Sequence, residues 1–133
     1  MNSFRLKIVT PDGLAFDGMA EELIVRTTTG DLGILAGHLP CVAPLGMGRA
    51  TVITEGKRRY AACIGGMVSV LDGHGSLVST TFEWAEDIDV ERALASERRA
   101  REVLKEKSST ATDIRLAEAR LKRALVRKSI AQE

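Results

Sequence analysis

Glycine and proline are confined to the first part of this chain. All 12 glycines lie at or before Gly75, and the three prolines, Pro11, Pro40 and Pro44, lie there too. Both residues mark turns and weaken the interiors of helices. The first part must therefore turn often, whereas the rest is free to form long helices. Within 133 residues the sequence predicts two structural units of different class.

The glycine-containing part carries the pattern of short β-strands. Apolar and β-branched runs alternate with turn signals, among them proline and Asp-Gly pairs. Strands are expected at residues 4–9, 22–27, 49–54, 58–64, 67–71 and 76–82. The glycine-rich stretch 27–41 is expected to turn tightly at one end of the domain. Short strands and frequent turns predict an all-β sandwich or barrel over residues 1–87.

The last third of the chain carries the helical period. Apolar residues recur at helical spacing in 89–107 and 111–130, and the polar stretch 108–112 separates the two runs. A short connection between helices makes them fold back on each other. The sequence therefore predicts an antiparallel α-helical hairpin over residues 88–133. Expected caps are Asp87 or Asp89 for the first helix and a Thr110/Asp113 capping box for the second.

The expected packing faces of this hairpin are modest. On the first helix one stripe joins Val90, Ala93, Leu94, Ala100 and Leu104 but is interrupted by Glu97, and a second stripe joins the smaller Ala93, Ser96, Ala100 and Val103. The second helix offers Ile114, Ala117, Leu121, Ala124 and Leu125. A face with so few large side chains buries little apolar area. We expect a marginally stable hairpin, which is suited to a conformational switch.

Charge follows the same division. Residues 1–87 carry 7 Lys and Arg against 10 Asp and Glu, and residues 88–133 carry 12 against 8, which gives net charges of −3 and +4. The excess lies mainly in the second helix, at Arg115, Arg120, Lys122, Arg123, Arg127 and Lys128. Such a face is either simply solvated or directed at an acidic protein or a polyphosphate. Without interleaved aromatic residues, nucleic acid is not expected as a partner.

Other functional classes find little support. Apolar runs fall short of a membrane span, and the start of the chain lacks the pattern of a secretory signal. Cys41 and Cys63 are isolated and predict reduced thiols in the cytosol. With two histidines in all, a metal site is not expected.

No catalytic constellation is visible in the sequence. Gly37 is followed by His38-Leu39 instead of the lysine and hydroxyl residue of a phosphate loop. The spacing of Gly30 and Gly33 does not fit a dinucleotide fingerprint, and the Gly-x-Ser-x-Gly motif of hydrolases is absent. No nucleophile or orienting carboxylate is fixed near His38, so we expect a structural or contact role for this residue and name no catalytic residue.

Four motifs in order carry a family resemblance. They are TPDG (10–13), GDLGILAGHLP (30–40), the glycine pair 65–66 and IDVERA (88–93). Along nearly its full length the chain resembles the epsilon subunit of bacterial F-type ATP synthases. The resemblance implies a β-sandwich that docks on the gamma subunit and the c-ring loops, with Asp31 and His38 facing the c-ring. It implies a non-catalytic rotor component that couples proton-driven rotation to ATP synthesis, at the cytoplasmic face of the plasma membrane.

The resemblance also implies a regulatory hairpin. Extended along gamma, its basic second helix would meet the alpha and beta catalytic subunits and block hydrolysis; folded down, it would permit turnover. Some members bind ATP as a regulatory ligand in the folded-down state, although no cofactor is required. The matching positions here are Glu83, Ile88, Asp89, Arg92, Ala93, Arg99, Arg123 and Arg127. Asp89 and Arg92 have a second interpretation, as a helix cap and its ion-pair partner.

Three rival interpretations stay open at this level. The chain could be a stand-alone β-sandwich binding module with an oligomerising tail. It could be a hydrolase that uses His38, or a subunit whose tail is a passive prop.

Overall fold

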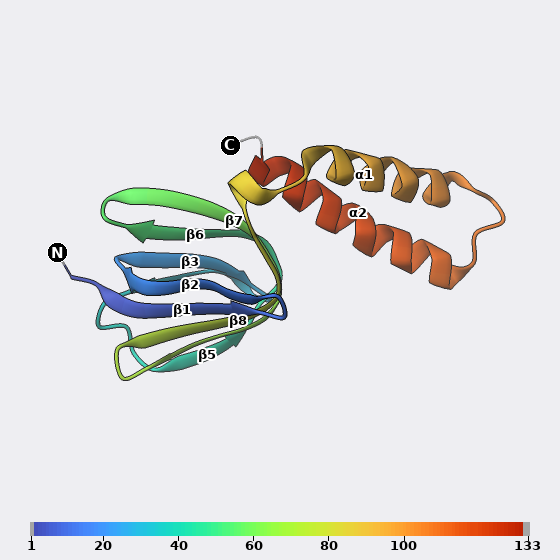
Figure 1. The fold of residues 1–133 in the computed structure, drawn as a ribbon. Coiled ribbons are helices and arrows are strands. Elements are labelled where there is room, and N and C mark those ends of the chain that lie inside the picture. The colour runs from blue at the N-terminus through green and yellow to red at the C-terminus, as the bar shows by residue number, and fades with distance from the viewer. Residues whose placement is uncertain (1, 132–133) are drawn as a thin grey trace. The chain divides into compact units, whose positions relative to one another are not determined.

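The computed structural model describes residues 2–131, and its contacts divide the chain into two compact units, Met1–Trp84 and Ala85–Glu133. Figure 1 shows the strands of the first unit and the helices of the second. The division falls between Trp84 and Ala85, slightly before the expected domain boundary at residue 87. Residues 1 and 132–133, at the ends of the expected domains, lie outside the described residues.

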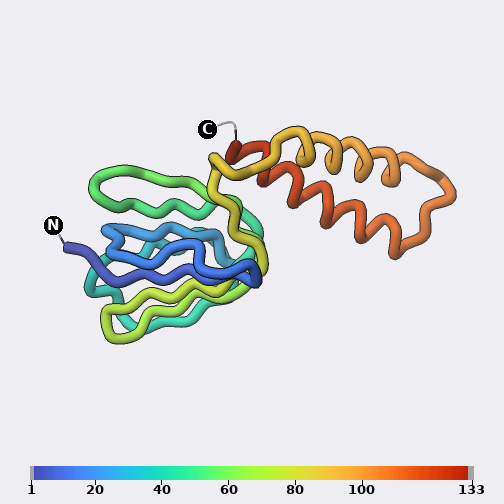
Figure 2. Tube along the Cα trace, viewed as in Figure 1, coloured from blue at the N-terminus to red at the C-terminus, as the bar shows by residue number. Residues whose placement is uncertain are grey.

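The first unit is an eight-stranded β-sandwich. Its strands are β1 (Phe4–Thr10), β2 (Gly13–Ala20), β3 (Glu22–Thr27), β4 (Gly30–Leu35), β5 (Cys41–Pro44), β6 (Met47–Thr54), β7 (Lys57–Leu71) and β8 (His74–Trp84). They are hydrogen-bonded in the order β2-β1-β8-β7-β6-β3-β4, and β5 pairs with β7. Only the described pair β1 and β8 is parallel, with Arg5 opposite His74. In Figure 2 the blue N-terminal strand β1 runs beside the yellow-green strand β8.

The stretch 30–40 is not the single loop that its glycines suggest. Residues Gly30–Leu35 form β4, paired in register with β3. Ile34 is fully buried and Leu32 packs against the core, so alternation along this strand supplies an inward face in spite of Gly33. The turns lie outside β4, and in the second of them the His38 amide donates to the Leu35 carbonyl.

The expected strands 58–64 and 67–71 are one bent strand. Gly65 and Gly66 have φ angles of +71° and +113°, which turn the chain inside β7. The first part of β7 pairs with β6, and the part after the bend pairs with β5, from Pro44 opposite Met67 onward. The glycine pair therefore lets one long strand serve two neighbours.

The core of the sandwich comes entirely from its own strands and the turn before β6. It comprises Phe4, Leu6, Ile8, Ala20, Leu23, Val25, Ile34, Leu45, Ala50, Val52, Ala61, Cys63, Val68, Val70, Leu77, Phe82 and Trp84. Trp84 is 8% exposed, packs edge-on against Phe16 and Phe82, and donates its indole N–H to the Ala15 carbonyl. This complete core predicts that the β unit folds without the hairpin.

The second unit is the expected helical hairpin. A short 3-10 helix, η1 (Ala85–Asp87), precedes α1 (Val90–Lys105) and α2 (Ala111–Ala131). Asp89, rather than Asp87, caps α1 by accepting from the Arg92 amide at 3.0 Å. The capping box of α2 is confirmed, because Thr110 and Asp113 each accept from the other's amide at 3.1 Å.

Four of the five buried residues in the described parts of the two helices are alanines, and the fifth is Ile130 of α2. Ala93 and Ala100 of α1 and Ala117 and Ala124 of α2 are buried, each pair spaced seven residues apart. The larger apolar side chains Val90, Leu104, Ile114, Leu116 and Leu125 are exposed. On α1 the stripe of small residues therefore forms the buried face. The alternative stripe, which contains Val90 and Leu104, is interrupted by Glu97. A face made of methyl groups contributes little hydrophobic free energy.

Candidate functional site

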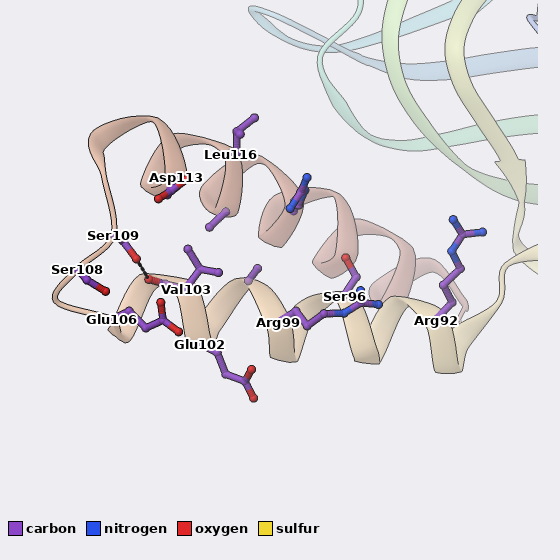
Figure 3. Close-up of a pocket in the computed structure, with 13 residues that line it drawn as sticks. Arg92, Ser96, Arg99, Glu102, Val103, Glu106, Ser108, Ser109, Asp113 and Leu116 are labelled. Atoms are coloured by element: carbon purple, nitrogen blue, oxygen red, sulfur yellow. Dashed lines mark hydrogen bonds between the residues drawn. The ribbon is translucent and has the colours of Figure 1, made fainter.

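An open cleft of about 740 Å³ lies between α1 and α2 (Figure 3). It is lined by Arg92, Ser96, Arg99, Ala100, Glu102, Val103, Glu106, Ser108, Ser109, Asp113, Leu116, Ala117 and Arg120. The buried Ala100 and Ala117 allow the two helices to pack closely here, and long polar side chains surround them. The cleft is therefore a polar groove with a small apolar base.

Three guanidinium groups from two helices line this cleft. Arg92 and Arg99 are seven residues apart on α1, so they project from one face of the helix, and Arg120 comes from α2. Within residues 2–131 none of the three side chains makes an ion pair or hydrogen bond. A guanidinium presents five N–H donors in a planar fork that suits carboxylate or phosphate. The cleft can thus receive an anion.

Acidic and hydroxyl groups lie toward the connecting loop. Figure 3 shows Glu102 and Glu106 at the loop end of α1, away from Arg92. Asp113 is occupied by the capping box, and the Ser109 hydroxyl donates to the Val103 carbonyl at 2.8 Å. The cleft therefore has a cationic part and an acidic end.

A second charged cluster ties the helices together outside the cleft. Glu97 accepts from Arg101 Nε at 3.1 Å and from Lys128 Nζ of α2 at 3.4 Å, and its side chain is 13% exposed. The Arg101 hydrogen bond, together with Lys128, lowers the pKa of Glu97 below its ordinary value. Glu97 does not line the cleft. Arg101 and Lys128 are therefore neutralised outside the cleft, by a carboxylate that the cleft arginines do not share.

The IDVERA residues have clear structural roles. Ile88 and Ala93 are buried, and Asp89 caps α1. Arg92 is exposed and lines the cleft. Ile88, Asp89 and Ala93 are therefore explained by folding alone, whereas the exposed Arg92 side chain has no such role among the described residues.

The structure brings together only part of the expected nucleotide-binding set. Arg92 and Arg99 line the cleft, whereas Asp89, Arg123 and Arg127 do not. Glu83 belongs to β8 of the sandwich unit, and both Glu83 and Arg127 have interaction partners. Arg120, expected only as part of a basic face, lines the cleft instead. Ala100 and Ala117 line the same cleft. Placing these two alanines opposite each other would have brought Arg120, one turn after Ala117, to the same cleft.

The basic residues of α2 do not act as one group. Arg120 lines the cleft, Lys128 pairs with Glu97, and Arg127 is engaged. Arg115 and Lys122 are exposed, and Arg123 is half-buried. The excess positive charge is thus distributed around the helix, with different neighbours at each position.

Asp31 and His38 occupy different elements of the sandwich. Asp31 lies in β4, is 58% exposed, and pairs with Arg26 of β3 at 2.8 Å. Gly48 of β6 makes room for Arg26, since an added Cβ would lie 2.7 Å from the Arg26 Cβ. His38 follows β4, and its Nδ1 lies 2.8 Å from the Leu39 carbonyl oxygen. A hydrolytic role would require a carboxylate that orients the imidazole. The described contacts of His38 include none.

The described residues contain no metal-binding cluster and no helix long and apolar enough to cross a membrane. Cys41 and Cys63 are both free thiols. Burial raises the pKa of the Cys63 thiol, which lies 3.5 Å from the Ser79 hydroxyl.

Fold and cleft together define a two-unit chain, a β-sandwich followed by a helical hairpin with an anion-receptive cleft. Two family models match these units: the β-sandwich domain of the ATP synthase delta/epsilon chain over residues 3–85, and the long α-helix domain of the same chain over residues 86–132. The chain belongs to the ATP synthase delta/epsilon chain family.

Relatives match over nearly the whole length. The ATP synthase epsilon chain of Bacillus velezensis is 43% identical, with 98% of each chain covered. That of Bacillus licheniformis is 42% identical, with 99% of this chain and 100% of the relative covered. The epsilon chain of Ruminococcus albus is 40% identical over 134 aligned positions, with 100% and 99% covered.

Solved structures share the fold. A chain of the Euglena gracilis mitochondrial ATP synthase superimposes with a TM-score of 0.83 at 24% identity, covering 97% of this chain and 81% of that one. A central-stalk or c-ring chain of the Tetrahymena thermophila mitochondrial enzyme gives 0.65 at 14% identity, covering 96% and 95%. The fold of a β-sandwich followed by a helical hairpin is therefore shared beyond the bacterial relatives.

Proposed function

We propose that this chain is a non-catalytic subunit of the ATP synthase rotor, whose hairpin regulates ATP hydrolysis. The observation that carries the proposal is the contrast between the two units. The β unit has a complete core of its own, whereas the buried residues of the two described hairpin helices are four alanines and Ile130. One unit is thus suited to stable docking and the other to rearrangement.

The β unit would dock on the gamma subunit and on the c-ring loops. Asp31 and His38 are the proposed c-ring contacts. The pairing of Asp31 with Arg26 supports a charged contact surface, since both side chains are about half exposed. Docking at these proteins would place the chain peripherally at the cytoplasmic face of the plasma membrane.

The hairpin would act on the alpha and beta subunits when it opens and extends. The exposed apolar residues Leu104, Ile114, Leu116 and Leu125 and the exposed cations Arg115 and Lys122 support this, because an opened hairpin offers both kinds of contact. These groups are also exposed in the folded hairpin, so folding down would permit hydrolysis by holding them away from the alpha and beta subunits.

Deletion of residues 88–133 tests the regulatory role. The complex carrying the truncated chain is expected to hydrolyse ATP faster than the complete one, because the inhibitory helices are gone. A steady-state hydrolysis assay on purified complexes measures this, with subunit stoichiometry confirmed by gel electrophoresis. Equal rates in the two complexes would reduce the hairpin to a passive prop. ATP hydrolysis by the isolated chain, lost in His38→Ala, would contradict the non-catalytic assignment.

ATP is the proposed regulatory ligand of the folded hairpin. The guanidiniums of Arg92 and Arg99, which have no partner among residues 2–131, support it, and binding to the closed hairpin alone would stabilise that state by mass action. Isothermal titration of the full chain with ATP should release heat that Arg92→Ala abolishes. Arg98→Ala, an exposed position of α1 outside the cleft lining, is the matched control and should bind normally. Equal heats for both variants would remove Arg92 from the site.

A further inference from the structure

Arg26 is a charged residue of the sandwich with a prepared position beside Asp31. Alternation along β3 buries Val25 and Thr27 and leaves Arg26 on the outer face. The register of β3 and β4 places Arg26 directly opposite Asp31, and Arg26 Nε lies 2.8 Å from Asp31 Oδ1. The two residues therefore form a cross-strand ion pair next to the end of the hydrogen-bonded strand order, where β4 lies.

Two glycines beside Arg26 leave room for its side chain. A Cβ added to Gly48 of β6 would lie 2.7 Å from Arg26 Cβ and 3.1 Å from its Cγ, and one added to Gly46 would lie 3.7 Å from the same Cγ. The Gly46 amide also donates to the Arg26 carbonyl at 3.0 Å. The stem of Arg26 thus lies against backbone while its guanidinium is paired with a carboxylate. A side chain held in this way loses little further conformational entropy when a partner binds it.

The pair keeps binding capacity for another molecule. Within residues 2–131 the only ion pair of Arg26 is with Asp31, and a guanidinium has five N–H donors. Both side chains are more than half exposed, at 52% and 58%. Because an exposed ion pair contributes little to folding stability, recognition of a partner is the better explanation for this arrangement.

We propose that Arg26 is a second contact residue of the c-ring docking surface and meets the c-ring loop together with Asp31, as a neutral pair. This inference rests on the proposed docking of Asp31 at the c-ring and adds the chemistry that the loop must offer. The guanidinium needs an acceptor, a carboxylate or a carbonyl oxygen, and the Asp31 carboxylate needs an N–H donor. A loop that carried cations alone would be repelled by Arg26.

Pairing also makes Arg26 a positioning residue for Asp31. The ion pair and the register of the two strands hold the carboxylate beside the guanidinium. Without Arg26 the Asp31 side chain is free to adopt other rotamers, so part of its contact with the loop is lost as well. The effects of the two residues on docking are therefore coupled, which separate contacts would not be.

The test measures how tightly the complex of the full chain with the gamma subunit binds the detergent-solubilised c-ring of the same enzyme, with gamma alone as the baseline. Arg26→Gln should weaken the binding that the chain adds by roughly tenfold, the effect of losing one charge-assisted contact. Arg26→Lys, which keeps the charge without the planar fork, should lie between Arg26→Gln and the unaltered chain.

Arg58→Gln is the matched control. Arg58 is an exposed arginine of β7 that pairs with Ile53, at the opposite end of β6 from Gly48. A charge removed so far from Arg26 should change the affinity by less than about twofold.

A double variant tests the pair itself. Asp31→Asn alone should weaken binding, and Arg26→Gln added to it should weaken binding by less than about twofold more, because the effects of paired residues are not additive. Two losses that multiply in full would overturn the pairing.

The remaining outcomes separate this inference from the docking proposal. If Asp31→Asn weakens binding while Arg26→Gln behaves like Arg58→Gln, the role of Arg26 is overturned and docking at the c-ring stands. If Arg26→Gln weakens binding and Asp31→Asn does not, the pair is overturned together with the proposed contact of Asp31. If the chain adds nothing to the binding by gamma, both proposals are overturned. Urea unfolding followed by Trp84 fluorescence confirms that each variant is folded, as expected for exposed side chains.

Discussion

At the scale of single residues, the glycine pair within β7 fixes the shape of the sandwich. A Cβ on Gly66 would lie 2.0 Å from the Val78 carbonyl oxygen, which is far inside contact distance. Its φ of +113° is also unfavourable for any L-residue with a side chain. Both constraints act on the backbone of a central strand pair, where relaxation would break the β7–β8 ladder.

We therefore expect Gly66→Ala to destabilise the β unit by about 3 kcal/mol or more. Gly73→Ala is the matched control, because Gly73 also has positive φ, +74°, but an added Cβ there meets nothing within 4 Å. It should cost only about 1–2 kcal/mol. Urea unfolding followed by Trp84 fluorescence measures both values. Equal losses would show that steric overlap with Val78 contributes nothing.

Glu97 gives the hairpin a pH dependence with a definite sign. Its pKa is lowered in the folded state, chiefly by the hydrogen bond from Arg101. A lowered carboxyl pKa contributes stability above the unfolded pKa of about 4.3, and that stability is lost as pH falls through the folded value. Thermal unfolding at 222 nm should thus show the unaltered chain more stable than Glu97→Gln at pH 6, with the difference shrinking below about pH 4.

The control for this effect is Glu102→Gln. Glu102 is exposed and makes no ion pair within residues 2–131, so this variant should keep the pH dependence of the unaltered chain. A stability gap between the unaltered chain and Glu97→Gln that stays constant from pH 6 to pH 3 would contradict the role of Glu97.

At the scale of elements, the sequence predicts central strands better than peripheral ones. The expected strands correspond to β1, β3, β6, β7 and β8, and β2, β4 and β5 were missed. The missed strands lie at the two ends of the hydrogen-bonded order or beside it. Edge strands are half paired and tolerate glycine and proline, as Gly33 and Pro44 illustrate, so their alternation is weak.

Only the part of the candidate site that lies on a single helix, α1, could be predicted from the sequence. Arg92 and Arg99 share a face of α1 through the helical period alone. Choosing between Arg120 and Arg123 requires the rotation of α2 against α1, which depends on the alanine contacts at Ala100 and Ala117. Local periodicity does not encode that rotation, because the first helix alone offers two alternative apolar stripes.

At the scale of the whole molecule, the two units should unfold separately. The core of the β unit contains no hairpin residue, and the only large buried side chain of the described parts of α1 and α2 is Ile130, beside four alanines. Heating should therefore abolish helical ellipticity at 222 nm at a lower temperature than the transition of Trp84, the only tryptophan in the chain. A fragment of residues 1–87 should keep the Trp84 transition within a few degrees. This independence would be contradicted if the helical and Trp84 transitions of the full chain occurred at the same temperature and the fragment lost the Trp84 transition.

The parallel pairing of β1 with β8 also determines how the chain comes to be folded. Strand β1 is synthesised well before β8. Its pairing with β8 can form only after the residues between Arg5 and His74 have been made. Closing so long a loop is slow, whereas the hairpin joins two helices that follow each other in the chain and separates its partners by far fewer residues, as Glu97 and Lys128 do with a separation of 31. A chain interrupted before residue 74 therefore keeps one edge of β1 open to aggregation. We therefore expect the sheet of the β unit to be completed only after β8 has been synthesised.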